Sequence, residues 1–429
     1  MKKKRYAIVG VSGRSASFTE SLMNTYKDRS EIVALLDSNP NRMTSFNQDH
    51  QLNLPCFGPD DFDRMVSETH PDSVIISSVD STHHTYIIAA LRNGIESICE
   101  KPMTTDEEKV RAILKARKES TAPAYITFNY RYGPVRTKIK EMLKEGKVGT
   151  VTHVDFNYFL DTFHGASYFK RWNRYEKLAG SLLVTKASHH FDLMNWWLDD
   201  RPAEVFCYGK LNYYGPNGTH NPEKVNGRRC STCNTKCKYY LRHSSTSGNA
   251  SEDEHLINFN NPGKNELYAQ SDGYYADRCI FDDDIDTWDT FVLSVRYESG
   301  ALMSYSLNAS LPYEGYRVAI NGTEGRIETN YIAGKVPRTP FPVNAPPQDI
   351  TYFPLFDGMQ TINVINRGGG HGGGDPIIKR DLFSQEPNDN YLGLVAGVED
   401  GAYAALLGIA ARISLKSGKP VKIADLLQG

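Results

Sequence analysis

The sequence lacks long apolar runs, and it lacks an excess of charge of either sign. No apolar stretch approaches the roughly 18 residues that a membrane-spanning helix needs. The 49 Lys and Arg residues nearly balance the 51 Asp and Glu residues, for a formal net charge of -2, so no overall basic field favours nucleic acid or an anionic membrane. A small-molecule partner is therefore expected. The 429 residues, 40% hydrophobic and 23% charged, predict a globular chain of about two domains.

Cysteine is also scarce. The chain has 7 cysteines, and an odd number in a long chain argues against a disulfide framework and predicts reduced thiols in a cytoplasmic protein. The basic start is followed by only a short apolar stretch, 6–9, which we interpret as a first strand and not as a signal peptide.

Short apolar runs alternate with helix-like segments in the first third of the chain. The runs cover 6–9, 32–36, 73–77, 95–99 and 124–128. This alternation predicts βαβ units, which form a parallel sheet with helices on both faces.

A glycine- and serine-rich turn follows the first run directly. Its residues are Gly10, Val11, Ser12, Gly13, Arg14 and Ser15. A dinucleotide-binding turn needs small residues where the backbone approaches a pyrophosphate, and a helix whose amides face the anion. Asp37 ends the second run, near the position at which a carboxylate grips a ribose diol, which favours NAD. NADP stays open because Arg14 and Arg42 can hold a 2′-phosphate.

Several stretches share their motifs and spacing with a known family. They are Asp80-Ser81-Thr82-His83, Cys99-Glu100-Lys101-Pro102, Gly180 to Asp192, and Gly401 to Val421. Together they resemble the Gfo/Idh/MocA family, the relatives of glucose–fructose oxidoreductase and inositol dehydrogenase. The resemblance implies an α/β Rossmann domain with a parallel, doubly wound sheet over 1–128. It also implies an α+β domain with a large, mostly antiparallel open sheet over 129–429, with an insertion at about 212–285 and a C-terminal helix, about 395–417, that packs back on the first domain.

Oxidation of a secondary alcohol needs a hydride acceptor, a group that takes the hydroxyl proton, and positive charge beside the developing alkoxide. Lys101 stands at the carboxyl edge of the expected parallel sheet, where doubly wound folds bind ligands. We predict that Lys101 polarises the substrate oxygen. The alternative is a surface lysine at the start of a helix.

The second motif supplies the other predicted catalytic residues. His189 is the expected proton acceptor, because an imidazole titrates near neutral pH. Asp192, one helical turn further on, is expected to orient that imidazole or to bind a substrate hydroxyl. Many dehydrogenases of the resembled family carry an Asp four residues before the His, where this chain has Thr185. Lys186 is either a second cation of the site or the partner of an acid.

Two further sets of residues are assigned to ligands. The predicted cofactor contacts are Gly10, Ser12, Gly13, Arg14, Ser15, Asp37, Asp80, His83, Glu100 and Lys101. The predicted substrate contacts are Asn129, Arg131, Trp172 and His190. Guanidinium forks and aromatic faces suit hydroxyl-rich rings, and packing is the alternative role.

Beyond residue 147 the pattern changes to alternating strands. We predict them at 150–159, 204–211, 290–297, 301–307, 317–321 and 326–330. The alternation indicates a largely antiparallel sheet with one exposed or paired face. In the resembled family this sheet is an oligomer surface, so a homodimer or homotetramer is expected from the resemblance.

The insertion contains a cluster of cysteines. Cys230, Cys233 and Cys237 form a C-x₂-C-x₃-C motif, and Cys279 follows later. Four thiolates suit a closed structural zinc site, which would stabilise a loop too polar to form its own core. An iron–sulfur cluster and plain reduced thiols are the alternatives.

A glycine-rich stretch around His371 ends at Asp375-Pro376, and a helix is expected over 377–383. This stretch is predicted to be a loop beside the substrate, with a linker as the alternative.

The leading hypothesis is an NAD-dependent oxidoreductase that acts on a secondary hydroxyl of a sugar, an inositol or a sugar-derived polyol. A second is a glycoside-cleaving enzyme in which retained NAD transiently oxidises a ring hydroxyl and assists elimination. A third is a dinucleotide sensor without catalysis.

Overall fold

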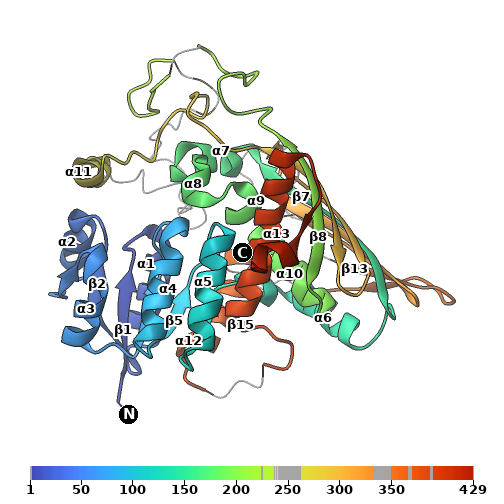
Figure 1. The fold of residues 1–429 in the computed structure, drawn as a ribbon, viewed down its shortest axis with the longest axis horizontal. Helices are drawn as coiled ribbons and strands as arrows, with labels where there is room; N and C mark the ends of the chain where they lie inside the picture. Colours follow the sequence, from blue (N-terminus) through green and yellow to red (C-terminus); the bar gives the residue numbers. More distant parts are fainter. Residues whose placement is uncertain are drawn as a thin grey trace.

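The computed structural model describes residues 2–223, 226–235, 237, 239, 262–332, 349–365, 370–386 and 390–428. Two β-sheets organise these residues (Figure 1). The first sheet lies near the N-terminus, and the second lies toward the opposite end of the molecule.

The first sheet confirms the expected Rossmann fold. Its order is β15 (Ala396–Gly397), β6 (Ala124–Ile126), β5 (Glu96–Cys99), β4 (Ser73–Ile76), β1 (Lys4–Val9), β2 (Ser30–Leu36) and β3 (Cys56–Phe57). All neighbours are parallel except β15, which runs antiparallel to β6. Tyr6 to Val9 in the centre are 0% exposed, because helices cover both faces.

The helices of this domain follow the strands in alternation. They are α1 (Gly13–Glu20), α2 (Pro40–Asp49), α3 (Phe62–Thr69), α4 (His83–Arg92) and α5 (Glu107–Lys118). A short turn of π-helix, Ser21–Thr25, extends α1, and the 3₁₀ turn η3 (Asp80–Thr82) precedes α4. The carboxyl ends of β1, β4 and β5 therefore lead into the turn at Gly10, into Asp80 and into Lys101.

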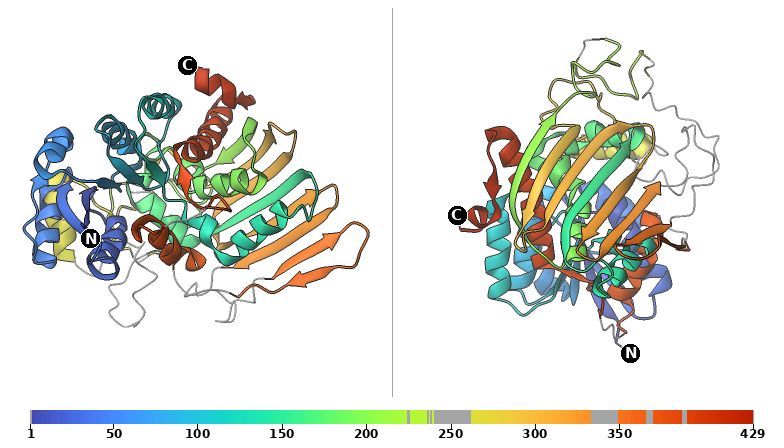
Figure 2. Two further views of the ribbon diagram at one scale, coloured as in Figure 1. Left: turned by 90° about the horizontal axis from the view of Figure 1, so that it is seen from below. Right: turned by 90° about the vertical axis from the view of Figure 1, so that its right-hand side faces the viewer.

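The second sheet is the predicted large, mostly antiparallel one. Its order is β14 (Gln360–Ile362), β13 (Ile350–Pro354), β12 (Gly325–Ile332), β11 (Gly315–Gly322), β7 (Val151–Asp161), β10 (Leu302–Leu311), β9 (Thr290–Tyr297), β8 (Pro202–Lys210) and β16 (Val421–Lys422). Only the central β7–β10 pair among the described strands is parallel. Strictly alternating burial along β9 shows that one face is packed and the other faces outward. Figure 2 shows that outward face without covering helices.

Helices cover the inner face of this sheet and connect it to the first domain. They are α6 (Pro134–Lys144), α7 (Thr162–Lys170), α8 (Glu176–Ala179), α9 (Leu182–Thr185), α10 (Ser188–Leu198), α13 (Val398–Ser417) and α14 (Ile423–Gln428). The 3₁₀ turn η4 (Asn129–Tyr132) joins β6 to α6, and η5 (Trp172–Arg174) joins α7 to α8. α13 packs against α10 and β8 on one side and against α5 of the first domain on the other. No helix in the described ranges is long and apolar enough to cross a membrane.

The glycine-rich stretch departs from its prediction. The helix α12 spans Gly370–Phe383 and contains Pro376, so it begins several residues earlier than expected. Gly374 packs on the backbone of η4, where a Cβ would lie only 2.5 Å from the Asn129 carbonyl oxygen. Tertiary packing thus recruits these glycines into a helix despite their low propensity. Residues 366–369 and the side chain of His371 lie outside the described part.

Candidate active site

The glycine- and serine-rich turn is built for close approach of a ligand. Gly10 has φ +87°, and a Cβ there would lie 2.4 Å from the backbone nitrogen of Ser78. A Cβ on Gly13 would meet nothing within 4 Å, so the space beside it is open. Ser12 caps α1, and the Ser15 hydroxyl donates to the Ser12 carbonyl at 2.8 Å. The two serines therefore fix the start of the helix without closing the turn.

Asp37 ties the turn to the end of β2. Its carboxylate accepts hydrogen bonds from the backbone N–H of Val11 at 2.6 Å and of Asn39 at 2.7 Å. Burial raises the pKa of Asp37, although both backbone bonds favour its charged form. The open turn, the helix start and this carboxylate fit a dinucleotide with its pyrophosphate at α1 and its ribose at Asp37.

Two other predicted cofactor residues hold the loops in place. Glu100 accepts from Arg14 Nε and from the Thr127 hydroxyl, each at 2.7 Å. His83 is buried, and its ring nitrogens face the carbonyl oxygens of Pro102 at 2.8 Å and of Ser78 at 3.1 Å. Both ring nitrogens therefore position the segment that carries Lys101, and the contact of His83 with the cofactor stays a prediction.

Lys101 and Asp80 meet at Thr185, which comes from the second domain. The Lys101 ammonium donates to the Thr185 carbonyl oxygen at 2.8 Å. Asp80 is buried and hydrogen bonds to the Thr185 side chain, and its Oδ2 has no hydrogen-bond partner in the described part of the chain. Thr185 thus brings an ammonium and a carboxylate of the first domain together.

Burial moves both groups toward neutral pH. Desolvation raises the pKa of Asp80 to about 7, although the charge of Lys101 opposes the shift. Desolvation also lowers the pKa of Lys101 to about 8, although the Asp80 and Glu100 carboxylates oppose it. A cation and an acid that titrate near neutral pH can exchange protons with a hydroxyl.

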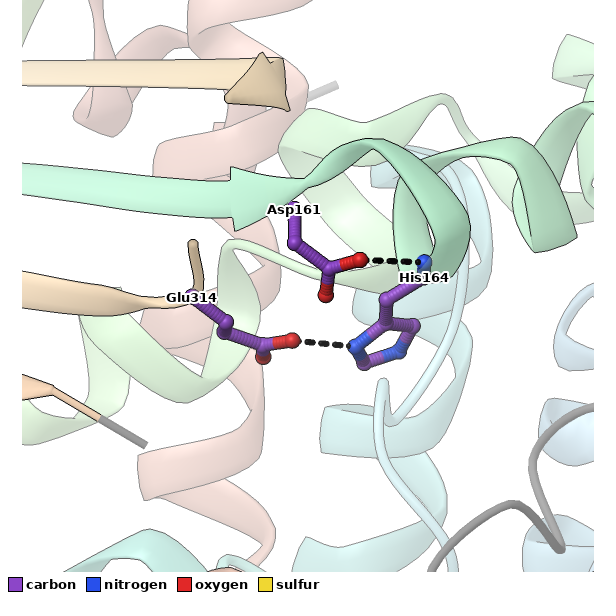
Figure 3. Close-up of side chains that lie close together, drawn as sticks. All are labelled: Asp161, His164 and Glu314. Carbon is purple, nitrogen blue, oxygen red and sulfur yellow. Dashed lines mark hydrogen bonds and ion pairs between the residues drawn. The ribbon is translucent and has the colours of Figure 1, made fainter. Parts of the chain in front are cut away.

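Lys186 leads to a second polar cluster. Figure 3 shows three of its side chains, Asp161 at the end of β7, His164 on α7 and Glu314 from the β10–β11 connection. The Glu314 carboxylate accepts from His164 Nδ1 at 2.7 Å, from the Tyr158 hydroxyl at 2.6 Å and from Lys186 at 3.3 Å. Burial alone would raise the pKa of Glu314, but the charges of His164 and Lys186 hold it well below its ordinary value. Lys186 therefore pairs with the acid Glu314, which is one of the two roles predicted for it.

The same cluster must be weighed as a metal site. Ligand atoms of Asp161, His164 and Glu314 all lie within 4.8 Å of one another. Asp161, however, caps α7 through the backbone N–H groups of Phe163 and His164 at 2.8 and 3.1 Å. The Lys186 ammonium already compensates Glu314, and a divalent cation there would be repelled. The cluster is a hydrogen-bonded ion-pair network.

Asp192 and Arg131 form a buried ion pair. Arg131 donates to both carboxylate oxygens of Asp192, at 2.8 and 2.5 Å, and the two side chains are 2% and 0% exposed. Arg131 also donates to Asp400 at 2.9 Å and to the Gly393 carbonyl oxygen at 2.7 Å. Asp192 and Arg131 therefore satisfy each other. The role of Asp192 in orienting His189 or binding a substrate hydroxyl, and that of Arg131 as a sugar contact, stay predictions.

The two neighbouring histidines have different surroundings. His190 is 0% exposed, lies among aromatic rings and pairs through Nδ1 with the Tyr305 hydroxyl at 2.8 Å. His190 is therefore bound within the core, and its contact with a substrate stays a prediction. His189 is stacked on Tyr130, with ring centroids 4.9 Å apart, and is 4% exposed.

Two predicted substrate contacts lie near other segments. Asn129 is buried and donates to the Asp375 carboxylate at 2.7 Å. Trp172 is half-buried, and its backbone hydrogen bonds to the Tyr274 hydroxyl of the insertion. The four predicted metal ligands, Cys230, Cys233, Cys237 and Cys279, line one cavity in the insertion.

Sequence reasoning missed Glu314, His164 and Asp161. The Asp161-x-x-His164 spacing at the start of a helix was the available signal, because it places both groups on one side of the first turn. No sequence signal marked Glu314, because only the fold brings its loop, between β10 and β11, close to α7.

A parallel sheet with this turn, an acid at the end of β2 and a lysine facing a second domain defines a dinucleotide-dependent dehydrogenase. Comparison with known families agrees with that class. Residues 4–128 match the "Oxidoreductase family, NAD-binding Rossmann fold", and residues 140–423 match the "Oxidoreductase family, C-terminal alpha/beta domain". The chain belongs to the Gfo/Idh/MocA family and is an NAD(P)-dependent dehydrogenase.

Individual relatives support the assignment. The chain is 44% identical over 433 residues to the Bacillus subtilis protein named "Putative oxidoreductase YteT", and the match covers 99% of each chain. It is 28% identical over 134 residues to an inositol 2-dehydrogenase of Rhizobium meliloti, covering 31% of this chain and 38% of that protein. A levoglucosan dehydrogenase solved with NADH and levoglucosan shares the fold, with a TM-score of 0.65 at 17% identity, over 98% of this chain and 100% of that one.

Proposed function

We propose that this dehydrogenase transfers a hydride between a nicotinamide cofactor and a secondary alcohol carbon of a sugar, an inositol or a sugar-derived polyol. The half-buried Lys101 and the buried Asp80 carry the proposal, because they offer a cation for an alkoxide and an unsatisfied carboxylate oxygen for a proton. Relatives named inositol 2-dehydrogenase, D-apiose dehydrogenase and levoglucosan dehydrogenase support the hydroxyl-rich substrate class.

Each residue of the site has its own role in the proposed reaction. A bound nicotinamide cofactor supplies the hydride acceptor. Lys101, held by the Thr185 carbonyl, donates a hydrogen bond to the substrate oxygen and stabilises its negative charge. Asp80 takes the hydroxyl proton as the alcohol becomes a carbonyl, and returns it in the reverse reaction. His189, the proton acceptor expected from the sequence, is the alternative for this step.

The cluster around Glu314 is proposed to recognise other hydroxyls of the substrate. Glu314 and His164 expose 16% and 23% of their side chains, so part of the cluster is accessible. The fixed charge pair with Lys186 keeps both polar groups oriented.

We propose NAD as the preferred cofactor. Asp37 suits a ribose diol, and Arg42, the residue that can bind a 2′-phosphate, is paired with Asp272 at 3.9 Å. Asp272 lies at the end of the insertion helix α11 (Pro262–Asp272), which rests on α2 (Figure 1). Its carboxylate also accepts from Asn39 at 2.7 Å, so negative charge stands where a 2′-phosphate would have to sit.

A substrate panel tests the proposal. The protein is mixed with NAD or NADP and with aldoses, inositols, sugar acids and small glycosides, and reduced nicotinamide is followed by absorbance and products by chromatography. Net reduction with a polyhydroxy substrate is expected. Glycoside cleavage without net reduction would instead indicate the retained-cofactor enzyme considered above.

The variant Lys101→Ala tests whether Lys101 stabilises negative charge on the substrate oxygen. Turnover should fall by about 10²–10³-fold while NADH binding remains, because the lost group acts on the substrate oxygen. Lys147→Ala, at an exposed lysine, is the matched control. Unchanged turnover of the Lys101 variant would refute the assignment.

We also propose that two copies associate through the outward face of the second sheet. Tyr208 on β8, Val292 on β9 and Leu302 on β10 are 68%, 57% and 51% exposed. Tyr208 and Val292 are directly opposite each other on paired strands, so these two side chains form one exposed apolar pair.

A further inference from the structure

The insertion between β8 and β9 takes no part in the proposed hydride transfer, yet it gathers four cysteines around one cavity. Cys230, Cys233, Cys237 and Cys279 all line it, and none forms a disulfide. Its free volume is about 20 Å³, which is room for about one water-sized occupant. We infer that this cavity holds one structural zinc ion bound by the four thiolates.

The backbone holds the two cysteine-bearing arms side by side. Arg229 and Arg278 form an isolated antiparallel bridge. Around it, Cys230 N–H donates to the Asp277 carbonyl oxygen at 2.8 Å, and Cys279 N–H donates to the Arg228 carbonyl oxygen at 2.9 Å. This ladder brings together cysteines that are far apart in the sequence, while the C-x₂-C-x₃-C spacing curls the first arm around the same cavity.

Two polar groups form hydrogen bonds to sulfur atoms that line the cavity. The backbone N–H of Phe281 hydrogen bonds to the Cys279 sulfur, two residues earlier. Lys170 is 3% exposed, donates to the Tyr239 carbonyl oxygen at 3.1 Å and hydrogen bonds to the Cys230 side chain. A zinc ion with four thiolates carries a net charge of about -2, so a buried ammonium beside it is electrostatically favourable.

The donor set selects the metal. Four sulfur ligands exclude calcium and magnesium, which take oxygen. A closed tetrahedral sulfur site is typical of structural zinc, and it leaves no open position for catalysis. The ion would therefore stabilise the insertion and take no part in hydride transfer.

The zinc site connects physically to the cofactor side of the first domain. Arg229, next to Cys230, pairs with Asp277 and with Glu266 of α11, each at 2.9 Å. α11 in turn receives hydrogen bonds from Asn39 and Asn41 at the start of α2, close to Asp37. The metal-held arm thus anchors the helix that lies beside the expected adenosine end of the cofactor.

Metal analysis of the full-length protein tests the inference. Protein purified without chelators should contain about one zinc per chain by mass spectrometry, and Cys230→Ser and Cys279→Ser should lose it. Cys56→Ser, at an exposed cysteine of the first domain, should keep it. Replacement of zinc by cobalt(II) in the unmutated protein should give thiolate charge-transfer absorption and the visible bands of a tetrahedral site, which keeps the test valid if the serine variants fail to fold.

Three results would overturn the inference: no stoichiometric metal, iron with inorganic sulfide, or zinc that stays bound in the cysteine variants. The last would place the ion elsewhere. A second readout is NADH affinity, which should weaken several-fold in the cysteine variants and stay unchanged in Cys56→Ser. Zinc content and the cobalt spectrum do not depend on turnover, so they stand or fall separately from the proposed reaction.

Discussion

Replacing Asp80 with asparagine isolates the proposed proton acceptor. The substitution keeps the size of the side chain and removes its charge, and Thr185 remains as a hydrogen-bond partner. In the unmutated enzyme, the pKa of Asp80 is raised to about 7 and that of Lys101 is lowered to about 8. With increasing pH, the kcat/KM for alcohol oxidation should rise as Asp80 loses its proton and then fall as Lys101 loses its proton. A narrow bell-shaped pH profile follows, whose limbs belong to the coupled pair.

The size of the change comes from the charges around Lys101. Asp80 and Glu100 are the two carboxylates that oppose the effect of burial on its ammonium. An opposite charge within about 4–6 Å shifts a pKa by about 1–3 units. Removal of the Asp80 charge should therefore lower the pKa of Lys101 by about 1–3 units and leave most of it neutral at the former optimum. Together with the loss of the proton acceptor, kcat/KM should fall by about 10²–10⁴-fold.

The assay is the initial rate of reduced-nicotinamide formation across pH, with the best substrate of the panel. In Asp80→Asn the acid limb should disappear and the remaining limb should move to lower pH. Asp63→Asn, at an exposed carboxylate of α3, is the matched control. A profile of unchanged shape that is only scaled down, with NADH affinity intact, would refute Asp80 as the titrating acceptor and return the role to His189.

Further predictions concern the other paired groups. Arg131→Met should lower the free energy of unfolding by about 3–5 kcal/mol in urea titrations, since it leaves the buried Asp192 charge uncompensated, and adding Asp192→Leu should recover most of the loss. Asp272→Asn should strengthen NADPH binding relative to NADH by about tenfold in fluorescence titrations, because it frees Arg42 for a 2′-phosphate. The same gain in Asp49→Asn, at the Lys264 pair on the other end of α11, would show a general charge effect. Tyr208→Lys should convert an oligomer to monomers in light scattering, and an unchanged mass would exclude this face.

The first domain could be predicted from the sequence because its signals are local. Each strand is buried on both faces and bounded by turn residues, so composition alone marks it. The strands that were missed, β3, β13, β14 and β15, are short or lie at the edges of the sheets, where few apolar residues repeat. The start of α12 was missed for another reason, since contacts with η4 outweigh the poor helix propensity of its glycines.

In the site, too, local motifs predicted some residues, whereas contacts between segments far apart in the sequence could not be predicted. The turn at Gly10 and the lysine after β5 follow from their positions on consecutive strands. Asp192 does lie one helical turn from His189, as the spacing indicates, yet Arg131 arrives from η4 and takes both of its oxygens. Spacing along one helix cannot exclude a stronger partner from another element, and a bidentate buried pair leaves no lone pair in the right place for an imidazole.

The second domain has Thr185 in place of a carboxylate, and Asp80 of the first domain supplies the carboxylate instead. Where relatives of the family place an Asp on the second domain, this chain places a hydroxyl and a carbonyl that bind Asp80 and Lys101 of the first. The acid and the cation of the proposed reaction therefore both belong to the domain that binds the cofactor, and the second domain aligns them through one residue. It follows that proton transfer requires the two domains to be docked at Thr185, so a loosened interface would reduce kcat before it reduced cofactor affinity.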